Sequence, residues 1–278
     1  MKIAVFSDLH VEHSNIDIDT TGVDITLFAG DIYALGQSRP NRLSVIDWIN
    51  SKVDNCPVLF VPGNHDFEAS DMTEQWEAWK EASRGTNIHC LWNEEFVLGN
   101  TRFLGTPLFT NFASAGNQEG CMNWARFGVG DMKVTRVSGR PLLPEDYLAW
   151  FNEAVSWLSQ ELSAPSSYDK NIVVSHFAPS KKMLNPKFAL VNNSAYWASD
   201  LDDLVALADI WFSGHTHKSF VFPPNSQTGK GCLASNARGV SKLFNVSADP
   251  NFSRNFVFDT EKMQPCQIKT SKKTWLKK

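Results

Sequence analysis

The sequence has few cysteines and no long hydrophobic run, and both absences exclude classes of protein. Its 278 residues include 5 Cys, an odd number scattered along the chain without a Cys-x-x-Cys pair. This argues against a disulfide framework and a Cys-rich zinc site, and it suits reduced thiols in a cytoplasm. No run of about 18 consecutive apolar residues exists, so we expect no membrane span. Asp8 and His10 interrupt the region where a signal peptide would continue, so we predict a soluble, cytoplasmic protein.

An excess of charge of one sign is also lacking. The chain has 26 Lys and Arg against 30 Asp and Glu, a net charge of −4. Without a global positive field we expect no bulk nucleic-acid binding, although a short strand at a local site stays open. The 16 Gly and 13 Pro are too few for a low-complexity chain, and 12% aromatic residues exclude global disorder. With no repeat and no clear linker, we predict a single domain over residues 1–278.

Short apolar segments alternate with amphipathic patterns along the chain. Five buried strands are predicted at residues 2–6, 25–29, 57–61, 171–175 and 209–213. Further strands are predicted at 95–98 and 101–104, joined as a hairpin by Gly99-Asn100, and at 231–235 and 255–259. Helices are predicted at 43–53, 74–84, 148–162 and 201–208, with Pro144 just ahead of the third. Apolar strands between amphipathic helices indicate an α/β fold with sheets covered by helices on their outer faces.

Two segments lack this order. Residues 105–143 contain many Gly, Asn and Arg with little periodicity, and we predict a loop-rich insert or lid. Residues 262–278 contain six Lys and predict a solvated basic tail.

Polar side chains with metal-binding chemistry gather directly after the five predicted strands. They are Asp8, His10, Asp31, Asn64, His65, Asp66, His176, His215 and His217. Five of the 7 His are in this set, which leaves only His13 and His89. One His at a strand end is usually structural, but α/β sheets bind their ligands beyond the carboxyl ends of strands. Carboxylate, carboxamide and imidazole groups suit divalent ions such as Mn²⁺, Fe²⁺, Zn²⁺ or Co²⁺, so the set predicts a metal centre.

The order and spacing of these motifs resemble the calcineurin-like metallophosphoesterase superfamily, in its branch of small bacterial or phage-type phosphohydrolases and phosphodiesterases. The motifs are D-L-H (8–10), G-D (30–31), G-N-H-D (63–66), His176 and G-H-T-H (214–217). The resemblance implies an α/β fold, a four-layer α/β/β/α sandwich of two mixed β-sheets, with two metals at the edge of the sheets. It implies a first metal held by Asp8, His10, Asp31 and His217, and a second held by Asp31, Asn64, His176 and His215. It further implies that His65 contacts the phosphate and protonates the leaving oxygen, while Asp66 orients the His65 ring.

Residue chemistry supports a dinuclear hydrolase independently of the resemblance. Two divalent ions with the carboxylates of Asp8 and Asp31 and one hydroxide leave a single positive charge, which a phosphate ester would neutralise. We therefore predict attack by a metal-bound hydroxide on a phosphate ester, with a His general acid. Mn²⁺ is the expected cofactor, with Fe, Zn, Co or Ni as alternatives. Asn64, His65 and Arg238, in the segment after the strand predicted at 231–235, are the expected substrate contacts.

The sequence limits the substrate only in part. The G-D motif at 30–31 has no Arg shortly after it, unlike the phosphoprotein phosphatases of the superfamily, which argues against a phosphoprotein substrate. Resemblance to the phosphodiesterase-like members favours a phosphodiester, and a nucleotide is one candidate for the phosphate-ester substrate. A nuclease acting on short or structured strands is one alternative. The insert offers it cations and aromatic rings, namely Arg126, Lys133, Arg136, Arg140, Trp124 and Phe127. A non-catalytic interaction scaffold is the other alternative, although every ligand position is filled. The sequence gives no indication of oligomeric state.

Overall fold

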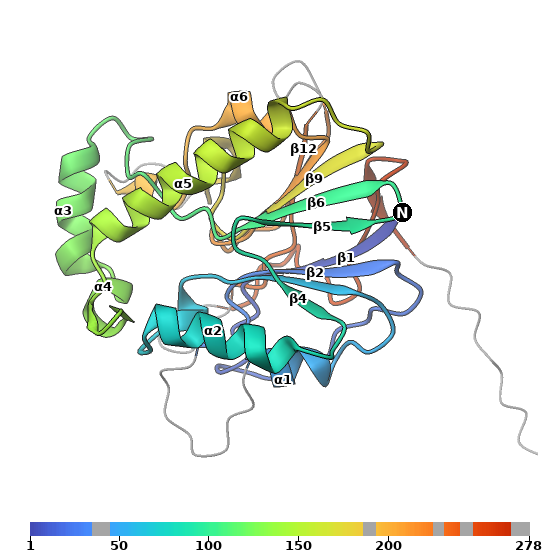
Figure 1. Cartoon of the computed structure of the whole chain (residues 1–278), viewed down its shortest axis with the longest axis horizontal. Coiled ribbons are helices and arrows are strands. Elements are labelled where there is room, and N and C mark those ends of the chain that lie inside the picture. The colour runs from blue at the N-terminus through green and yellow to red at the C-terminus, as the bar shows by residue number, and fades with distance from the viewer. Residues whose placement is uncertain (35–44, 186–192, 225–230, 240–246, 268–278) are drawn as a thin grey trace, which may run out of the picture.

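Two mixed β-sheets lie face to face in the middle of the molecule (Figure 1). The computed structural model describes residues 1–34, 45–185, 193–224, 231–239 and 247–267. The first sheet has the strand order β14 (Gln264–Cys266), β13 (Val257–Asp259), β1 (Lys2–Phe6), β2 (Ile25–Ala29), β3 (Val58–Val61) and β4 (Ile88–Cys90). The second has the order β11 (Phe220–Phe222), β12 (Cys232–Ser235), β10 (Ile210–Phe212), β9 (Lys170–Ser175), β6 (Thr101–Thr106) and β5 (Glu94–Leu98).

The central strands of each sheet are parallel, and antiparallel strands close the sheets. In the first sheet β1 to β4 run parallel, with Ile3 opposite Ile25 and Leu27 opposite Leu59. In the second, β6, β9, β10 and β12 run parallel, whereas β5 and β11 pair antiparallel. Parallel neighbours end on the same side, so the residues that follow them are brought together.

Helices cover the outer face of each sheet. The α-helices are α1 (Val45–Asn50), α2 (Met72–Ser83), α3 (Gln118–Gly128), α4 (Asp131–Val134), α5 (Pro144–Ser163) and α6 (Asp202–Val205). The described residues also contain the short 3₁₀ turns η1 (His65–Phe67), η2 (Lys181–Met183) and η3 (Ser194–Tyr196). Helices α1 and α2 lie on the first sheet, and α5 and α6 lie on the second (Figure 1). This arrangement is the predicted four-layer α/β/β/α sandwich.

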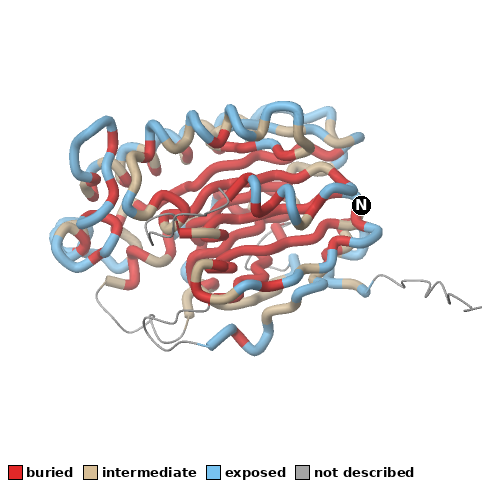
Figure 2. Tube along the Cα trace, turned by 90° about the horizontal axis from the view of Figure 1, so that it is seen from below, coloured by how far each residue is buried: buried red, intermediate tan, exposed pale blue. Residues whose placement is uncertain are grey.

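The alternation of side chains along the strands separates two hydrophobic layers. Val5, Leu27 and Val174 point into the layer between the sheets, where they are fully buried. Phe28 and Phe60 belong to the larger layer that includes the helices. Because both faces of the central strands are covered, these strands are apolar throughout, and Figure 2 shows them buried while the outer helices keep an exposed side.

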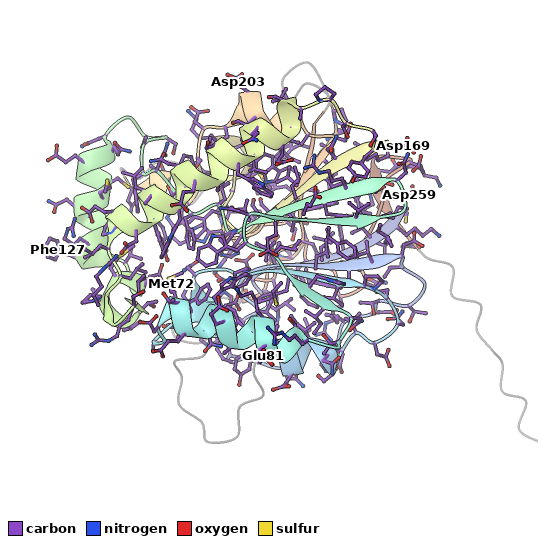
Figure 3. The ribbon with its side chains drawn as sticks, in the orientation of Figure 1. Met72, Glu81, Phe127, Asp169, Asp203 and Asp259 are labelled. Carbon is purple, nitrogen blue, oxygen red and sulfur yellow. The ribbon has the colours of Figure 1, made fainter. Side chains whose placement is uncertain are left out.

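The segment 105–143 differs from the expected loop, because α3, α4 and the short hairpin β7 (Arg136–Val137) with β8 (Arg140–Pro141) lie within it. Helix α3 begins at the Asn117 cap, whose side chain accepts from the Gly120 amide. Only Cys121 and Ala125 of α3 are buried, and Phe127 lies on the outside of the molecule (Figure 3). So short a buried face leaves too little periodicity for the sequence to predict the helix.

Smaller differences concern the ends of predicted elements. The helix predicted at 201–208 is a single turn, α6, and the expected basic tail begins with strand β14. Leu43, placed on the first predicted helix, and residues 268–278 lie outside the described residues. All five cysteines are free. Within the described part of the chain, no helix is both long and apolar enough to cross a membrane.

Candidate metal centre

The strand-end residues come together where the two sheets meet. Asp8, Asp31 and Asn64 follow β1, β2 and β3 of the first sheet. His176 follows β9 and His215 follows β10 of the second sheet. Two groups of ligand atoms result, one of Asp8, His10, Asp31 and His217, the other of Asp31, His176 and His215, each with its atoms within 4.8 Å of one another. Asp31 belongs to both groups, as the resemblance implies for a bridging ligand.

Five of these residues adopt a backbone conformation that L-amino acids rarely adopt. Their φ angles are 51° at Asp8, 46° at His10, 56° at Asp31, 67° at His215 and 52° at His217. Each left-handed residue costs on the order of 1–3 kcal/mol. Such strain persists where the surrounding structure imposes it, and it gathers at functional sites.

In the first group, atoms of the two sheets converge on one point. His10 Nε2 lies 3.3 Å from His217 Nε2, and His217 Nε2 lies 3.4 Å from Asp8 Oδ1. Two nitrogen ligands at tetrahedral angles around one metal would lie about 3.4 Å apart. The spacing of the two imidazoles therefore fits a shared metal ion.

In the second group, His176 Nε2 lies 3.3 Å from Asp31 Oδ2 and 3.1 Å from Asn64 Oδ1. The other ring nitrogen, Nδ1, donates to the Ala29 carbonyl at 2.9 Å. That bond places the ring proton on Nδ1 and leaves the Nε2 lone pair for a metal.

Two glycines allow the second group to pack this closely. A Cβ on Gly30 would lie 2.3 Å from His176 Nδ1, and a Cβ on Gly63 would lie 2.2 Å from Asp31 Oδ1. Neither position has room for a side chain. Gly30 also has a φ of +79°, which favours glycine.

Burial and mutual charge shift the pKa values of the group. Burial raises the pKa of Asp8 to about 6, with the Asp31 carboxylate adding to the effect. Burial, with the nearby His10 adding to the effect, lowers the pKa of His217 to about 3. Burial and the neighbouring His176 hold the pKa of His215 well below its usual value. His215 and His217 are therefore neutral, which is the form that binds metals. At His176 the Asp31 carboxylate outweighs burial and raises the pKa to about 9, so a metal ion there would displace a ring proton.

Two buried polar atoms at this site support a divalent ion directly. Asp31 Oδ2 and His215 Nε2 are buried, and neither has a hydrogen-bond partner among the described residues. A buried polar atom without a partner is costly, and an ion bound by both would remove that cost. The donor set of carboxylates, imidazoles and one carboxamide suits a first-row divalent metal.

The His65 side chain stands at the open side of the site. Its amide donates to Asp31 Oδ1 at 2.8 Å, and its ring makes an edge contact with the His10 ring at 5.1 Å between centroids. The ring is 38% exposed, unlike the buried rings beside it. This exposure lets an external ligand reach His65.

The metal groups and the fold agree with comparisons to known proteins. The family model for calcineurin-like phosphoesterases matches residues 1–219. The chain belongs to the calcineurin-like phosphoesterase family. Members of this metal-dependent family hydrolyse phosphate esters, and the clustered His and Asp groups are this phosphoesterase's candidate metal ligands.

Solved structures support the fold. Phosphopantetheinyl hydrolase from Mycobacterium tuberculosis aligns with a TM-score of 0.61 at 14% identity, over 91% of this chain and 98% of that chain. A predicted phosphoesterase from Streptococcus pneumoniae aligns only weakly, with a TM-score of 0.30 at 12% identity over 93% of this chain and 83% of that chain. No curated protein matches the sequence significantly.

Asp66 of the phosphoesterase has a different task from the predicted one. Its carboxylate accepts four backbone N–H bonds of 2.8 to 3.0 Å, from Gly63, Asp31, Ile32 and Tyr33. With these donors its two oxygens hold the β2 and β3 ends together instead of orienting His65. The carboxylate beside the His65 ring is Glu68, with Oε2 3.6 Å from Nδ1.

Arg238 also differs from the prediction that it contacts phosphate. Its guanidinium is buried and donates to the carbonyls of Leu9 and Ser14 at 2.8 Å and to the Ser14 hydroxyl at 2.6 Å. Arg238 therefore supports the loop that carries His10.

Sequence reasoning missed two carboxylates beside the ligands. Glu12 Oε1 lies 3.0 Å from His10 Nδ1, and Glu12 Oε2 accepts from the Ala34 amide at 3.1 Å. Glu12, His13 and His10 form a third group of possible ligand atoms. A neutral imidazole keeps a proton on one ring nitrogen, so His10 cannot bind one metal through Nε2 and another through Nδ1. Glu12 and His13 follow the D-L-H motif by only two and three residues in the sequence, and this short spacing could have indicated that Glu12 lies beside His10.

The second missed carboxylate is Asp131, which accepts from the Asn64 side chain. Nothing in the sequence around Asp131 pointed to it.

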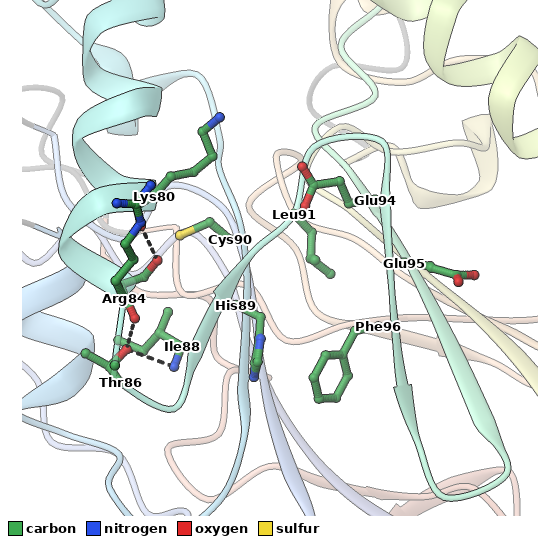
Figure 4. Close-up of a pocket in the computed structure, with 12 residues that line it drawn as sticks. Lys80, Arg84, Thr86, Ile88, His89, Cys90, Leu91, Glu94, Glu95 and Phe96 are labelled. Carbon is green, nitrogen blue, oxygen red and sulfur yellow. Dashed lines mark hydrogen bonds between the residues drawn. The ribbon is translucent and has the colours of Figure 1, made fainter.

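A separate pocket lies between α2, β4 and β5 (Figure 4). Its lining includes Lys80, Arg84, His89 and Glu94, but none of the strand-end residues. Among the described residues, this pocket is therefore separate from the candidate metal centre.

Proposed function

We propose that the chain is a dinuclear metallophosphoesterase that hydrolyses a phosphodiester. One observation carries the proposal: two groups of ligand atoms share Asp31, as a pair of bridged metals requires. In the proposed assignment Asp8, His10, Asp31 and His217 hold one ion, and Asp31, Asn64, His176 and His215 hold the other. Mn²⁺ is the proposed ion. Two such ions, when bound, would activate water and neutralise charge on the phosphate.

The protein residues orient the ester and supply a proton. His65, whose ring contacts His10 at the open side of the site, would bind phosphate oxygens, whereas Asn64 is buried with its NH₂ group bound by Asp131. His65 Nδ1 faces Glu68, which leaves Nε2 to give its proton to the leaving oxygen as the P–O bond breaks. The pKa of His65 is raised to about 10, because the Asp31 and Glu68 carboxylates outweigh the effect of burial.

A small phosphodiester, a nucleotide among the candidates, suits the insert better than a nucleic acid. Arg126 pairs with Glu145, and Arg140 pairs with Asp146 at 2.6 Å. Arg136 donates to the Gly139 carbonyl at 2.9 Å. Arg126 and Arg140, whose charges are balanced by carboxylates, therefore contribute little to a groove for a nucleic-acid backbone.

The test is hydrolysis of a chromogenic phosphodiester and the matching monoester by metal-stripped protein, before and after Mn²⁺ is added. Wild-type protein should need Mn²⁺ and prefer the diester. Asp31→Asn should lose both metal binding and turnover, while His65→Gln should bind metal and lose turnover by about 10²–10⁴-fold. Wild-type protein that bound no metal would favour the scaffold alternative, whereas two bound metals without turnover of either ester would contradict the proposed phosphodiester preference and point to a more demanding substrate. Full activity of Asp31→Asn would refute the assignment.

A further inference from the structure

A buried carboxylate from the insert contacts the candidate metal centre. Asp131 begins helix α4 and is 4% exposed. Both of its oxygens accept from Asn64 Nδ2 at 3.2 Å. Its Oδ2 also accepts from the hydroxyls of Tyr196 at 2.7 Å and Tyr147 at 3.1 Å.

The donors to Asp131 come from separate parts of the fold. Asn64 follows β3, Tyr147 lies on α5 and Tyr196 ends η3. Both tyrosine rings are buried, and burial together with the Asp131 charge holds the pKa of each hydroxyl well above its usual value. The hydroxyls are therefore protonated donors. A buried carboxylate is tolerated where such donors satisfy it, and here they fix its position.

This position determines which end of the Asn64 carboxamide faces the ligands of the second group. A carboxylate accepts only, so it must face the NH₂ end of the amide. The oxygen end then points the other way, where Asn64 Oδ1 lies 3.1 Å from His176 Nε2. The negative charge behind the NH₂ group also polarises the amide, which makes its oxygen a better ligand.

We propose that Asp131, held by Tyr147 and Tyr196, is a positioning residue that locks the Asn64 carboxamide as a ligand of the second metal. The inference rests on the proposed two-metal function. If the Asp131 charge were removed, the Asn64 carboxamide would be free to rotate. The insert around α4, which carries Asp131, is therefore part of the metal centre.

Calorimetric titration of metal-free protein with Mn²⁺ tests the inference without any assay of activity. In Asp131→Asn, which keeps the shape but loses the charge, one of two Mn²⁺ binding steps should weaken by about 10–100-fold while the other stays unchanged. The matched control is Glu119→Gln, an exposed carboxylate on α3 of the same insert, which should bind both ions normally. Tyr147→Phe and Tyr196→Phe each remove one hydroxyl, and each should weaken the same step by a smaller factor.

A double-mutant cycle separates positioning from a general effect on the fold. Asn64→Ala should weaken that same Mn²⁺ step, and adding Asp131→Asn to it should cause no further loss. An equal loss in the Asn64→Ala background, or an equal weakening of both steps, would overturn the inference. Normal binding by Asp131→Asn and both Tyr→Phe variants would overturn it while the two-metal assignment stands. If the wild-type protein bound no Mn²⁺, both proposals would fail together.

Discussion

At the scale of single residues, hydrogen bonds on one ring nitrogen decide what the other nitrogen can do. His176 donates a hydrogen bond from Nδ1 to the Ala29 carbonyl, and His10 Nδ1 lies 3.0 Å from the Glu12 carboxylate. In both rings this leaves Nε2 facing Asp31, at 3.3 Å and 3.9 Å from its Oδ2. A carbonyl and a carboxylate thus orient one imidazole in each group of candidate ligands.

Replacing Glu12 by Gln should weaken Mn²⁺ binding by the first group by about 10–100-fold. Each oxygen of Glu12 accepts one hydrogen bond, from the His10 ring and from the Ala34 amide. In Gln one of these oxygens is replaced by an NH₂ group, which would place a donor against one of the two N–H donors. Titration calorimetry checks the result, with the exposed Glu153→Gln on α5 as the control. Unchanged affinity would mean that Glu12 does not orient His10.

Arg238 should contribute to stability rather than to substrate affinity. Arg238→Lys keeps the positive charge but cannot satisfy the Leu9 and Ser14 carbonyls together with the Ser14 hydroxyl. We expect the free energy of unfolding to fall by about 1–3 kcal/mol, as measured by urea denaturation. A variant of normal stability with a raised KM would instead restore Arg238 as a phosphate contact.

At the scale of elements, side-chain caps fasten the insert to the helices around it. Asp71 caps α2 by accepting from the Thr73 amide at 3.0 Å. The same carboxylate accepts from Ser138 and Gly139, in the turn between β7 and β8. Asp146 joins the start of α5 to Arg140 of β8 and to the Leu143 amide. These bonds give the insert fixed attachments to the starts of α2 and α5.

The Asp146 attachment should make a pH-dependent contribution to stability. Burial raises the pKa of this carboxyl, but the hydrogen bonds from Arg140 and the Leu143 amide outweigh burial and lower the pKa below 3.8. A lowered folded-state pKa stabilises the protein above the unfolded-state value, and the effect is lost as the pH falls through the folded-state value.

Asp146→Ala should therefore lower the free energy of unfolding by about 1 kcal/mol at neutral pH. The difference from wild type should stay constant down to about pH 5 and shrink below pH 4. Urea denaturation at a series of pH values measures it. If the difference in the free energy of unfolding between wild type and Asp146→Ala grew as the pH fell, the pKa of Asp146 would not be lowered in the folded protein.

At the scale of the whole molecule, the candidate ligands link the two sheets. Asp8, Asp31 and Asn64 extend from the first sheet, and His176 and His215 extend from the second. An ion bound by both sets therefore binds only where the sheets are docked. Metal binding and the packing of the inner hydrophobic layer are coupled for this reason.

Removing metal should lower the melting temperature. Ligand present at about 100 times its dissociation constant stabilises the folded state by about 2.7 kcal/mol, which corresponds to roughly 5–10 °C for a chain of this size. Calorimetry of Mn²⁺-loaded protein with and without a chelator measures the shift. Asp31→Asn should show a much smaller shift, because both groups lose a ligand. Equal melting temperatures for loaded and stripped wild-type protein would argue against ions that join the sheets.

The sequence alone was sufficient to predict the central strands and to locate the candidate ligands along the chain. Buried parallel strands need apolar residues on both faces, so a strand such as Ile25–Ala29 is recognisable as an apolar run in the sequence. The polar residues that follow each run mark the edge of the sheet. The hairpin of β5 and β6 and the Pro144 start of α5 were predicted from equally local signals. These features depend on neighbours within a few residues, which a single sequence contains.

Only the tertiary structure decided which side chains surround those ligands. Asp66 lies beside His65 in the sequence but binds the backbone 33 to 35 residues away, and Arg238 reaches Leu9 across 229 residues. Asp131 meets Asn64 across 67 residues, from a helix too short to leave a periodic pattern. Periodicity and motifs report the local path of the chain, whereas hydrogen-bond partners depend on how distant elements pack. The sequence thus determined the candidate ligands, and the packing of the insert and loops determined what holds them in place.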